Sequence, residues 1–243
     1  MTNISYNAKW GLRDGISICL GYIPVSFAFG IFAVSQGLTP WQAILVSALN
    51  VTSAGQLAGV PLLIGGSTVF EMALTQLLIN MRYFLTSISL SQKLADDVRF
   101  GDKFAIAYVN TDEVFAVCAY KDGVLSRSYL YSLIIPPVIG WVLGTAVGAF
   151  AGNVLSPFLL NTLGFLIYGM FLSILVPPAR RSRSILLAEL IAILFSSLLY
   201  YIPWFSFISP GFSIIITASI SALIMCFLAP IPDDVTQEVN VDE

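Results

Sequence analysis

The sequence predicts an all-α protein that crosses a membrane several times. Hydrophobic residues make up 57% of its 243 residues, and charged residues only 10%, whereas an ordinary soluble domain is about 25% charged. Three long stretches, residues 15–70, 128–179 and 190–232, contain no charged residue. Because a helix needs about 20 mainly apolar residues to cross a membrane, each stretch is long enough for two crossings and a turn.

Turn-forming residues divide the chain into eight apolar segments, so we expect a helical protein with seven or eight crossings, some of the segments being broken or re-entrant. The segments are approximately residues 15–34, 41–63, 68–90, 104–120, 128–151, 156–176, 184–201 and 210–229. The first lacks an Ala-x-Ala-like cleavage site and is interpreted as an uncleaved span. We expect one membrane domain, 1–243, with four segments in each of two halves, 1–120 and 121–232, and a short polar tail, 233–243.

The fourth segment, 104–120, is the weakest span. Asn110, Thr111, Asp112 and Glu113 follow one another at its middle, and a lipid-exposed helix does not tolerate such a row. Asn110 and Glu113 also have the spacing of a capping box, which predicts a helix that begins at residue 111. Two alternatives remain open: the segment crosses, or it re-enters and leaves seven crossings.

The positions of Lys and Arg indicate the orientation, because these residues favour cytoplasmic loops. If all eight segments cross, the basic residues before the first segment, in the 121–127 loop and at 180–183 lie on one side. We therefore expect both termini in the cytoplasm, with the 180–183 cluster also meeting anionic lipid. The 91–103 loop, which carries Lys93, Arg99 and Lys103, would lie outside, against the rule.

Several segments contain residues that break helices at the expected membrane depth. They are Gly21 and Pro24 in the first segment, Gly55 and Gly59 in the second, and Pro136 and Pro137 in the fifth. In transporters, such interruptions free backbone groups that bind a substrate. Alternatively, they only bend helices or let them pack closely.

Arg82 is an isolated cation near the centre of the third segment. A cation at this depth costs about 2.5 kcal/mol or more, so it needs water or a partner. One interpretation is a substrate clamp, because a guanidinium matches a carboxylate with two parallel hydrogen bonds. The other is a permanent ion pair with Asp112, Glu113 or Glu71.

Further polar residues are candidates for the site. Those expected to bind substrate beside Arg82 are Asn50, Ser53, Gly55, Gln56 and Asn80. The alternative for the second segment is that its polar side chains only join helices. Asp112 and Glu113 are the candidates for binding an ammonium group or for coupling transport to protons.

Several classes of function are excluded or disfavoured. The absence of histidine excludes HExxH metalloproteases, Ser-His-Asp triads and histidine proton relays. No P-loop or GxGxxG motif occurs, and the three cysteines lack metal-site spacing. We therefore expect no catalytic residue, no metal, no cofactor and no nucleic-acid partner.

Three motifs occur in a familiar order: Ser47-Ala-Leu-Asn-Val-Thr-Ser-Ala-Gly-Gln-Leu57, Ile79-Asn-Met-Arg-Tyr-Phe-Leu85 and Thr111-Asp-Glu-Val-Phe-Ala116. With Gly15, Pro24 and Phe29-Gly30 before them, they resemble the AzlC-type branched-chain amino acid permeases over roughly residues 10–120. The residues that match the family motifs are Gln56, Asn80, Arg82, Asp112 and Glu113. Many relatives have histidine where this chain has Tyr83, so a proton mechanism that uses that histidine is not transferred.

The resemblance implies a larger subunit that exports branched-chain amino acids together with a short AzlD-type membrane protein. We therefore expect a secondary transporter, not an enzyme, that moves small zwitterionic amino acids such as leucine, isoleucine or valine out across the cytoplasmic membrane. Proton coupling is one option. The rival hypotheses are an intramembrane enzyme that uses Asp112 and Glu113, and a passive channel or scaffold.

Overall fold

The computed structural model describes residues 6–152, 169, 172, 175–177, 179–180 and 182–229. This part of the chain is helical and forms no β-strand, which confirms the all-α fold class. Its helices are α1 (Ala8–Ser35), α2 (Pro40–Leu49), α3 (Ser53–Ile64), α4 (Val69–Ser91), α5 (Phe100–Tyr108), α6 (Asp112–Ala119), α7 (Arg127–Gly152), α9 (Arg183–Tyr201), η1 (Pro203–Phe205) and α10 (Pro210–Leu228). The sixth apolar segment and the polar tail lie mostly or wholly outside the described residues.

The helices belong to two compact units, which we describe separately. Unit 1 contains Met1–Gly66 and Gln76–Met170, and unit 2 contains Ser67–Thr75 and Phe171–Glu243. Four described helices are long and apolar enough to cross a membrane: α1 and α7 in unit 1, and α9 and α10 in unit 2. These helices confirm a helical membrane protein.

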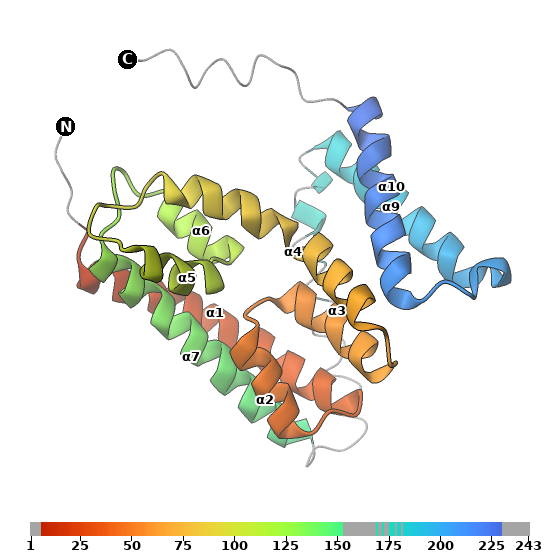
Figure 1. Cartoon of the computed structure of the whole chain (residues 1–243), viewed down its shortest axis with the longest axis horizontal. Helices are drawn as coiled ribbons and strands as arrows, with labels where there is room; N and C mark the ends of the chain where they lie inside the picture. The colour runs from red at the N-terminus through yellow and green to blue at the C-terminus, as the bar shows by residue number, and fades with distance from the viewer. Residues whose placement is uncertain are drawn as a thin grey trace. The chain divides into compact units, whose positions relative to one another are not determined.

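Helices α1 and α7 lie side by side and run in the same direction over their whole length (Figure 1). Gly11 of α1 faces Tyr129 near the start of α7, whereas Gly148 near the end of α7 faces Phe27. A Cβ atom at Gly148 would collide with the Phe27 carbonyl oxygen. Glycine therefore lets the two backbones approach closely, as small residues commonly do between membrane helices.

The prolines inside these two helices do not interrupt them. Pro24 lies within α1, and Pro136 and Pro137 lie within α7, yet both helices continue past them. The structure therefore favours the alternative that these prolines only bend the helices or let them pack closely. Neighbouring helices can compensate for the hydrogen bonds that a proline removes, so a proline in a membrane helix does not have to end it.

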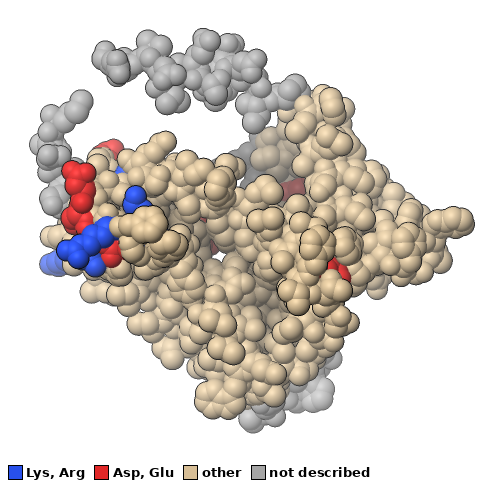
Figure 2. Space-filling view, viewed as in Figure 1, with Lys and Arg blue, Asp and Glu red and all other residues tan. Residues whose placement is uncertain are grey.

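Charged side chains of unit 1 gather where α1 and α7 begin (Figure 2). We call this region the charged end. Lys121 pairs with Asp14 at 2.8 Å, which connects the segment before α7 to α1. Leu125 exchanges backbone hydrogen bonds with the 93–95 segment. The 91–103 and 121–127 loops therefore lie at the same end of unit 1.

Asp102 is a buried carboxylate at the charged end. The Tyr131 hydroxyl donates to it at 2.8 Å, the Arg99 amide donates at 2.9 Å, and the Arg127 guanidinium lies 2.9 Å away. These contacts, the Tyr131 hydrogen bond foremost, hold the pKa of Asp102 below its ordinary value although burial acts in the opposite direction. Asp102 thus connects α5 to the start of α7.

Helices α2 and α3 form a hairpin that enters from the opposite end of unit 1. Trp41 of α2 packs against Phe150 near the end of α7, and Val60 of α3 belongs to the same hydrophobic cluster as Phe29 near the end of α1. Both helices thus reach this end, and the turn between them, residues 50–52, lies at mid-depth. The predicted single segment 41–63 is therefore two short helices.

Helices α5 and α6 form a second hairpin, which enters from the charged end. Asp102 at the start of α5 contacts Arg127, and the Lys93 ammonium donates to the carbonyl oxygens of Ala119, the last residue of α6, and of Lys121. The fourth predicted segment therefore re-enters rather than crosses. Thr111 caps α6, which begins at Asp112, so the predicted start at residue 111 is one residue early.

The two breaks at mid-depth contain neither glycine nor proline. They are residues 50–52 and 109–111, while Gly55 and Gly59, two of the candidate interruptions, lie inside α3. Thr52 and Thr111 each accept a hydrogen bond from the first turn of the following helix. Side-chain capping of a new helix therefore explains both break positions.

Unit 2 contains the first turns of α4 together with α9, η1 and α10. Glu71 of α4 is buried, and its carboxylate accepts hydrogen bonds from the Ser209 hydroxyl and from the Gly211 amide at 3.0 Å. These donors lie at the start of α10, where backbone N–H groups lack partners within the helix. The Ser209 side chain does not cap α10. Glu71 caps this helix instead, by accepting from the Gly211 amide.

Candidate functional site

A cavity of about 180 Å³ lies where the two hairpins meet in unit 1. We call it the central cavity. It is lined by residues of both breaks, the adjoining helix ends and α4: Leu49, Asn50, Val51, Thr52, Asn80, Tyr83, Ala107, Tyr108, Asn110 and Thr111. The Tyr108 hydroxyl donates to the carbonyl oxygen of Ala48, which joins the tips of the two hairpins directly.

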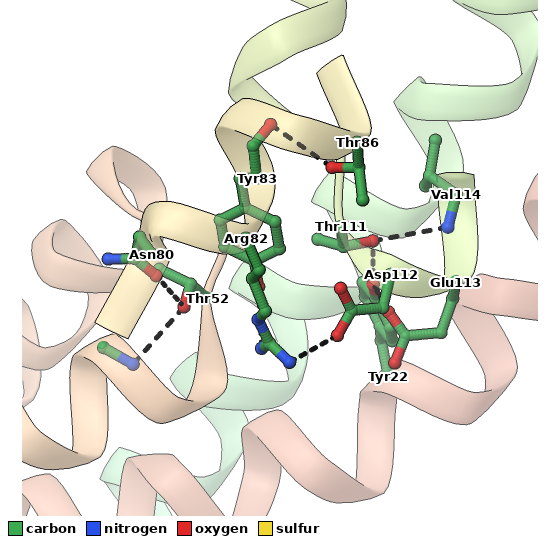
Figure 3. Close-up of polar contacts among 11 residues, drawn as sticks. Tyr22, Thr52, Asn80, Arg82, Tyr83, Thr86, Thr111, Asp112, Glu113 and Val114 are labelled. Carbon is green, nitrogen blue, oxygen red and sulfur yellow. Dashed lines mark hydrogen bonds and ion pairs between the residues drawn. The ribbon is translucent and has the colours of Figure 1, made fainter. Parts of the chain in front are cut away.

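Hydrogen bonds between α4 and the first hairpin shape one wall of this cavity. The Thr52 hydroxyl donates to the Asn80 side-chain oxygen at 3.0 Å (Figure 3). The Asn80 amide donates in turn to Gln76, and Gln76 donates to the carbonyl oxygen of Gly55 at 2.8 Å. A Cβ atom at Gly55 would lie 2.6 Å from the Gln76 side-chain oxygen. Gly55 therefore contributes to this wall in two ways: its carbonyl oxygen accepts from Gln76, and the absence of a side chain leaves room for Gln76.

Two helices begin beside the central cavity, and their first turns differ in charge. Helix α3 begins after Thr52 and has no acidic residue in its first turn. Helix α6 begins after Thr111 and has Asp112 and Glu113 there. The start of a helix carries a partial positive charge and attracts anions. The start of α3 is thus capped by the neutral Thr52 side chain alone, whereas α6 supplies its own carboxylates.

Arg82 forms an ion pair with Asp112. Their nitrogen and oxygen atoms are 2.6 Å apart, and both side chains are about half exposed (Figure 3). The guanidinium group also lies beside Tyr83, donating to its hydroxyl at 3.3 Å. Of the proposed partners of Arg82, the structure selects Asp112, because Glu71 lies in the cap of α10. Arg82 and Asp112 adjoin cavity residues but do not themselves line the cavity.

Glu113 has a different partner from Asp112. It accepts a hydrogen bond from the Tyr22 hydroxyl at 2.7 Å, and the Tyr22 and Thr111 hydroxyl oxygens are within hydrogen-bond distance, 2.5 Å apart. Tyr22 lies in the middle of α1, so this contact fixes the second hairpin against that helix. Because Asp112 faces Arg82 and Glu113 faces Tyr22, the two carboxylates do not converge as an acid and base on one reacting atom.

Gln56 lies away from the central cavity, in a buried polar chain between α3, α2 and α7. It is 1% exposed, accepts from the Trp141 indole nitrogen at 3.0 Å, and donates to the Ser47 hydroxyl at 2.9 Å. Ser47 and Thr145 share a further hydrogen bond of 2.7 Å. The geometry therefore assigns Gln56 to holding helices together.

The structure brings only some of the predicted substrate-binding residues together. Asn50 and Asn80 line the central cavity, while Arg82 lies beside it and Ser53 is not among the lining residues. Sequence reasoning did not assign the lining residues Tyr83 and Tyr108 to the site. Recognising the two hairpins in the sequence would have identified these two tyrosines, because that topology brings residues 107–111 next to α4 and to the first break.

Comparison with known proteins shows the family. A family model described as AzlC protein matches residues 17–155, more than half of the chain and the whole of the central cavity. The chain belongs to the AzlC family. This AzlC chain is 30% identical over 232 residues to the inner membrane protein YgaZ of Escherichia coli, covering 92% of this chain and 93% of that protein.

Two other relatives are uncharacterised membrane proteins. The one from Archaeoglobus fulgidus is 32% identical over 181 residues, or 73% of the AzlC chain and 79% of the relative. The one from Helicobacter pylori is 26% identical over 177 residues, or 70% and 74%. No solved structure matches. The family match and the likeness to YgaZ indicate a membrane protein of transporter type.

Proposed function

We propose that the chain is a secondary transporter that exports small zwitterionic amino acids, branched-chain ones first, across the cytoplasmic membrane. The observation that carries this proposal is the central cavity between two broken hairpins that enter unit 1 from opposite ends. Secondary transporters bind substrates near the membrane midplane, at discontinuous helices whose ends supply unpaired backbone groups. Membership of the AzlC family agrees with this class.

The polarity around the cavity suits a zwitterion. The start of α3, behind Thr52, offers backbone N–H groups without an acidic neighbour, which favours a carboxylate. Asp112, at the start of α6 on the other hairpin, offers negative charge for an ammonium group if its pair with Arg82 opens. A molecule with both charges would thus lie across the two hairpin tips. Leu49, Val51 and Ala107 supply apolar contacts for an aliphatic side chain.

The charged end is proposed to face the cytoplasm. The basic residues in the first turns of α1, in the 91–103 loop and in the 121–127 loop all lie at this end of unit 1, and basic residues near the membrane favour the cytoplasmic side. This orientation removes the conflict that an eight-crossing chain has with the 91–103 loop. Labelling of single cysteines from each side of the membrane would test it, and external labelling of residue 122 would contradict it.

A small AzlD-type membrane protein is the proposed partner. Arg82 of α4 and Asp112 of α6 are both half exposed. Leu77, Phe84 and Leu85, on the same part of α4 as Arg82, are also exposed. An exposed ion pair among lipid tails is unfavourable, so water or another protein surface must cover it. A short membrane subunit with a polar group at mid-depth fits this surface. If the chain alone transports fully in liposomes, a partner is not required.

The transport proposal is tested with sealed vesicles that contain the chain with and without the small subunit. Leucine efflux should saturate, and valine and isoleucine should compete for it. Leucinamide, which lacks the carboxylate, and 4-methylpentanoate, which lacks the ammonium group, should compete poorly. Asn80→Ala should raise the KM because Asn80 lines the cavity, whereas Gln42→Ala, at an exposed cap of α2, should not. Non-saturable flux would instead favour a passive channel.

Proton coupling through Asp112 or Glu113 is the remaining part of the proposal. The two carboxylates have separate partners, Arg82 and Tyr22, so their substitutions should be separable. One of the two variants, Asp112→Asn or Glu113→Gln, should reduce the dependence of efflux on the proton gradient, and the other should leave that dependence unchanged. If both variants keep the native pH profile, coupling does not run through these carboxylates.

A further inference from the structure

A second cavity lies on the charged-end side of the central cavity. Its volume is about 130 Å³, and we call it the vestibule. It is lined by the last turns of α4, the 91–103 loop and α5: Ser87, Leu90, Ser91, Leu94, Lys103, Ile106, Ala107 and Asn110. Lys103 is exposed and has no ion pair among the described residues. A cation at this position would attract the carboxylate of an amino acid.

The two cavities share a wall at the tip of the second hairpin. Asn110 and Ala107 are the residues that line both of them. Asn110 is only 3% exposed, and its side-chain nitrogen donates to the hydroxyls of Ser87 at 2.9 Å and Thr86 at 3.3 Å. The Asn110 side chain therefore closes the space between α5 and α4, which is the direct route from one cavity to the other.

Asn110 is not fully satisfied in this position. Its side-chain oxygen is buried and accepts no hydrogen bond from the described residues. A buried carbonyl oxygen without a donor costs about 1–3 kcal/mol, which offsets part of the gain from the two hydrogen bonds that the side-chain nitrogen makes. The closed position is thus weakly held, and a ligand N–H group or water that reached the oxygen would favour another position.

We propose that Asn110 is the inner gate of the transport path: its hydrogen bonds to Ser87 and Thr86 separate the vestibule from the central cavity, and their opening joins the two. The gate admits an amino acid that has entered the vestibule with its carboxylate toward Lys103. This inference rests on the proposed transport function, but the gate can be measured without any substrate.

Cysteine accessibility tests the gate directly. The three native cysteines, Cys19, Cys118 and Cys226, are first replaced. Asn50→Cys then places a reporter in the central cavity, and Ser91→Cys places one in the vestibule. A membrane-impermeant thiol reagent is applied to sealed vesicles of each orientation, in separate experiments, and the labelling rates are measured.

The reporter in the vestibule should react from the charged-end side at the same rate in every background. The reporter in the central cavity should react slowly from that side with Asn110 present, and at least tenfold faster with Asn110→Ala. Ser87→Ala, which removes an acceptor and keeps Asn110, should accelerate labelling in the same direction. Gln42→Ala is the matched control, because Gln42 is an exposed amide at the cap of α2 that lines neither cavity, and it should not change the rate.

Three results would overturn the proposal. One is an unchanged rate at residue 50 in both gate variants while residue 91 reacts normally. Another is an equal acceleration by Gln42→Ala, which would indicate general loosening. The third is a vestibule reporter that reacts from neither side. If labelling changes as expected but no amino acid is transported, the gate stands and the proposed substrate class is wrong. If amino acids are transported but labelling does not change, only the gate is wrong.

Discussion

Replacing Gln56 should destabilise the protein rather than weaken substrate binding alone. Gln56→Ala removes the hydrogen bonds to Trp141 and Ser47 and leaves the buried indole N–H without a partner. Hydrogen bonds between membrane helices average about 0.6 kcal/mol each, and a buried donor left unpaired costs about 1–3 kcal/mol. Together these give a loss of about 2–4 kcal/mol. At about 2–4 °C per kcal/mol for a protein of this size, the midpoint should fall by about 5–15 °C.

The assay is thermal unfolding in mild detergent, followed by the fraction that remains monodisperse, for three glutamine variants. The loss should be greatest for Gln56→Ala and smaller for Gln76→Ala, which removes the bond to the Gly55 carbonyl group. It should be smallest for Gln42→Ala, at the exposed cap of α2. Native stability of Gln56→Ala together with a raised KM would refute the reasoning and return Gln56 to the substrate site.

Three further predictions concern other contacts in unit 1. Arg82→Ala should lower the abundance of the protein in the membrane, and adding Asp112→Asn should recover part of the loss. The coupling energy from a double-mutant cycle should be about 0.2–1 kcal/mol because the pair is half exposed. A coupling energy of zero would argue against the ion pair. Gly148→Ala should cost about 1–3 kcal/mol by overpacking α1 against α7, whereas Gly21→Ala, which meets open space, should be neutral or slightly stabilising in the same thermal assay. Asp102→Asn should lower the unfolding midpoint most at neutral pH. A carboxylate with a lowered pKa stabilises the fold above its ordinary pKa of about 4, and this effect is lost as pH falls through the lower value. A difference in midpoint between the two proteins that stays constant from pH 7 to pH 3 would contradict this cause.

Composition and hydropathy predict the fold class because lipid imposes long apolar helices. The long helices α1, α7, α9 and α10 were therefore found at nearly their observed positions. The positions of the breaks could not be predicted, for a local reason. Glycine and proline were candidates for interrupting the helices, with bending or close packing as the alternative, but the interruptions occur beside Thr52 and Thr111, which cap the helices that follow. A threonine cap in an apolar run is hard to recognise because threonine also occurs inside membrane helices.

The site was harder to predict than the fold because it depends on contacts between distant segments. Asn80 and Arg82 are two residues apart, yet one lines the cavity and the other pairs with Asp112 beside it. Gln56 is a candidate from sequence because it is polar within an apolar segment. In the structure its side-chain oxygen accepts a hydrogen bond from the indole N–H of Trp141, 85 residues later in the chain. Neither periodicity nor spacing specifies such a partner.

The two hairpins also give unit 1 an internal symmetry. Helix α1 runs away from the charged end and is followed by a hairpin from the opposite end, whereas α4 runs back and is followed by a hairpin from the charged end. The α1–α3 and α4–α6 segments thus have inverted topologies, as in transporters whose repeats are related by an axis in the membrane plane. One hairpin, α2–α3, then enters from one face of the membrane, and the other hairpin, α5–α6, enters from the opposite face. Under the proposed transport function, exchange of the roles of the two hairpins would convert a cavity open to one side of the membrane into a cavity open to the other.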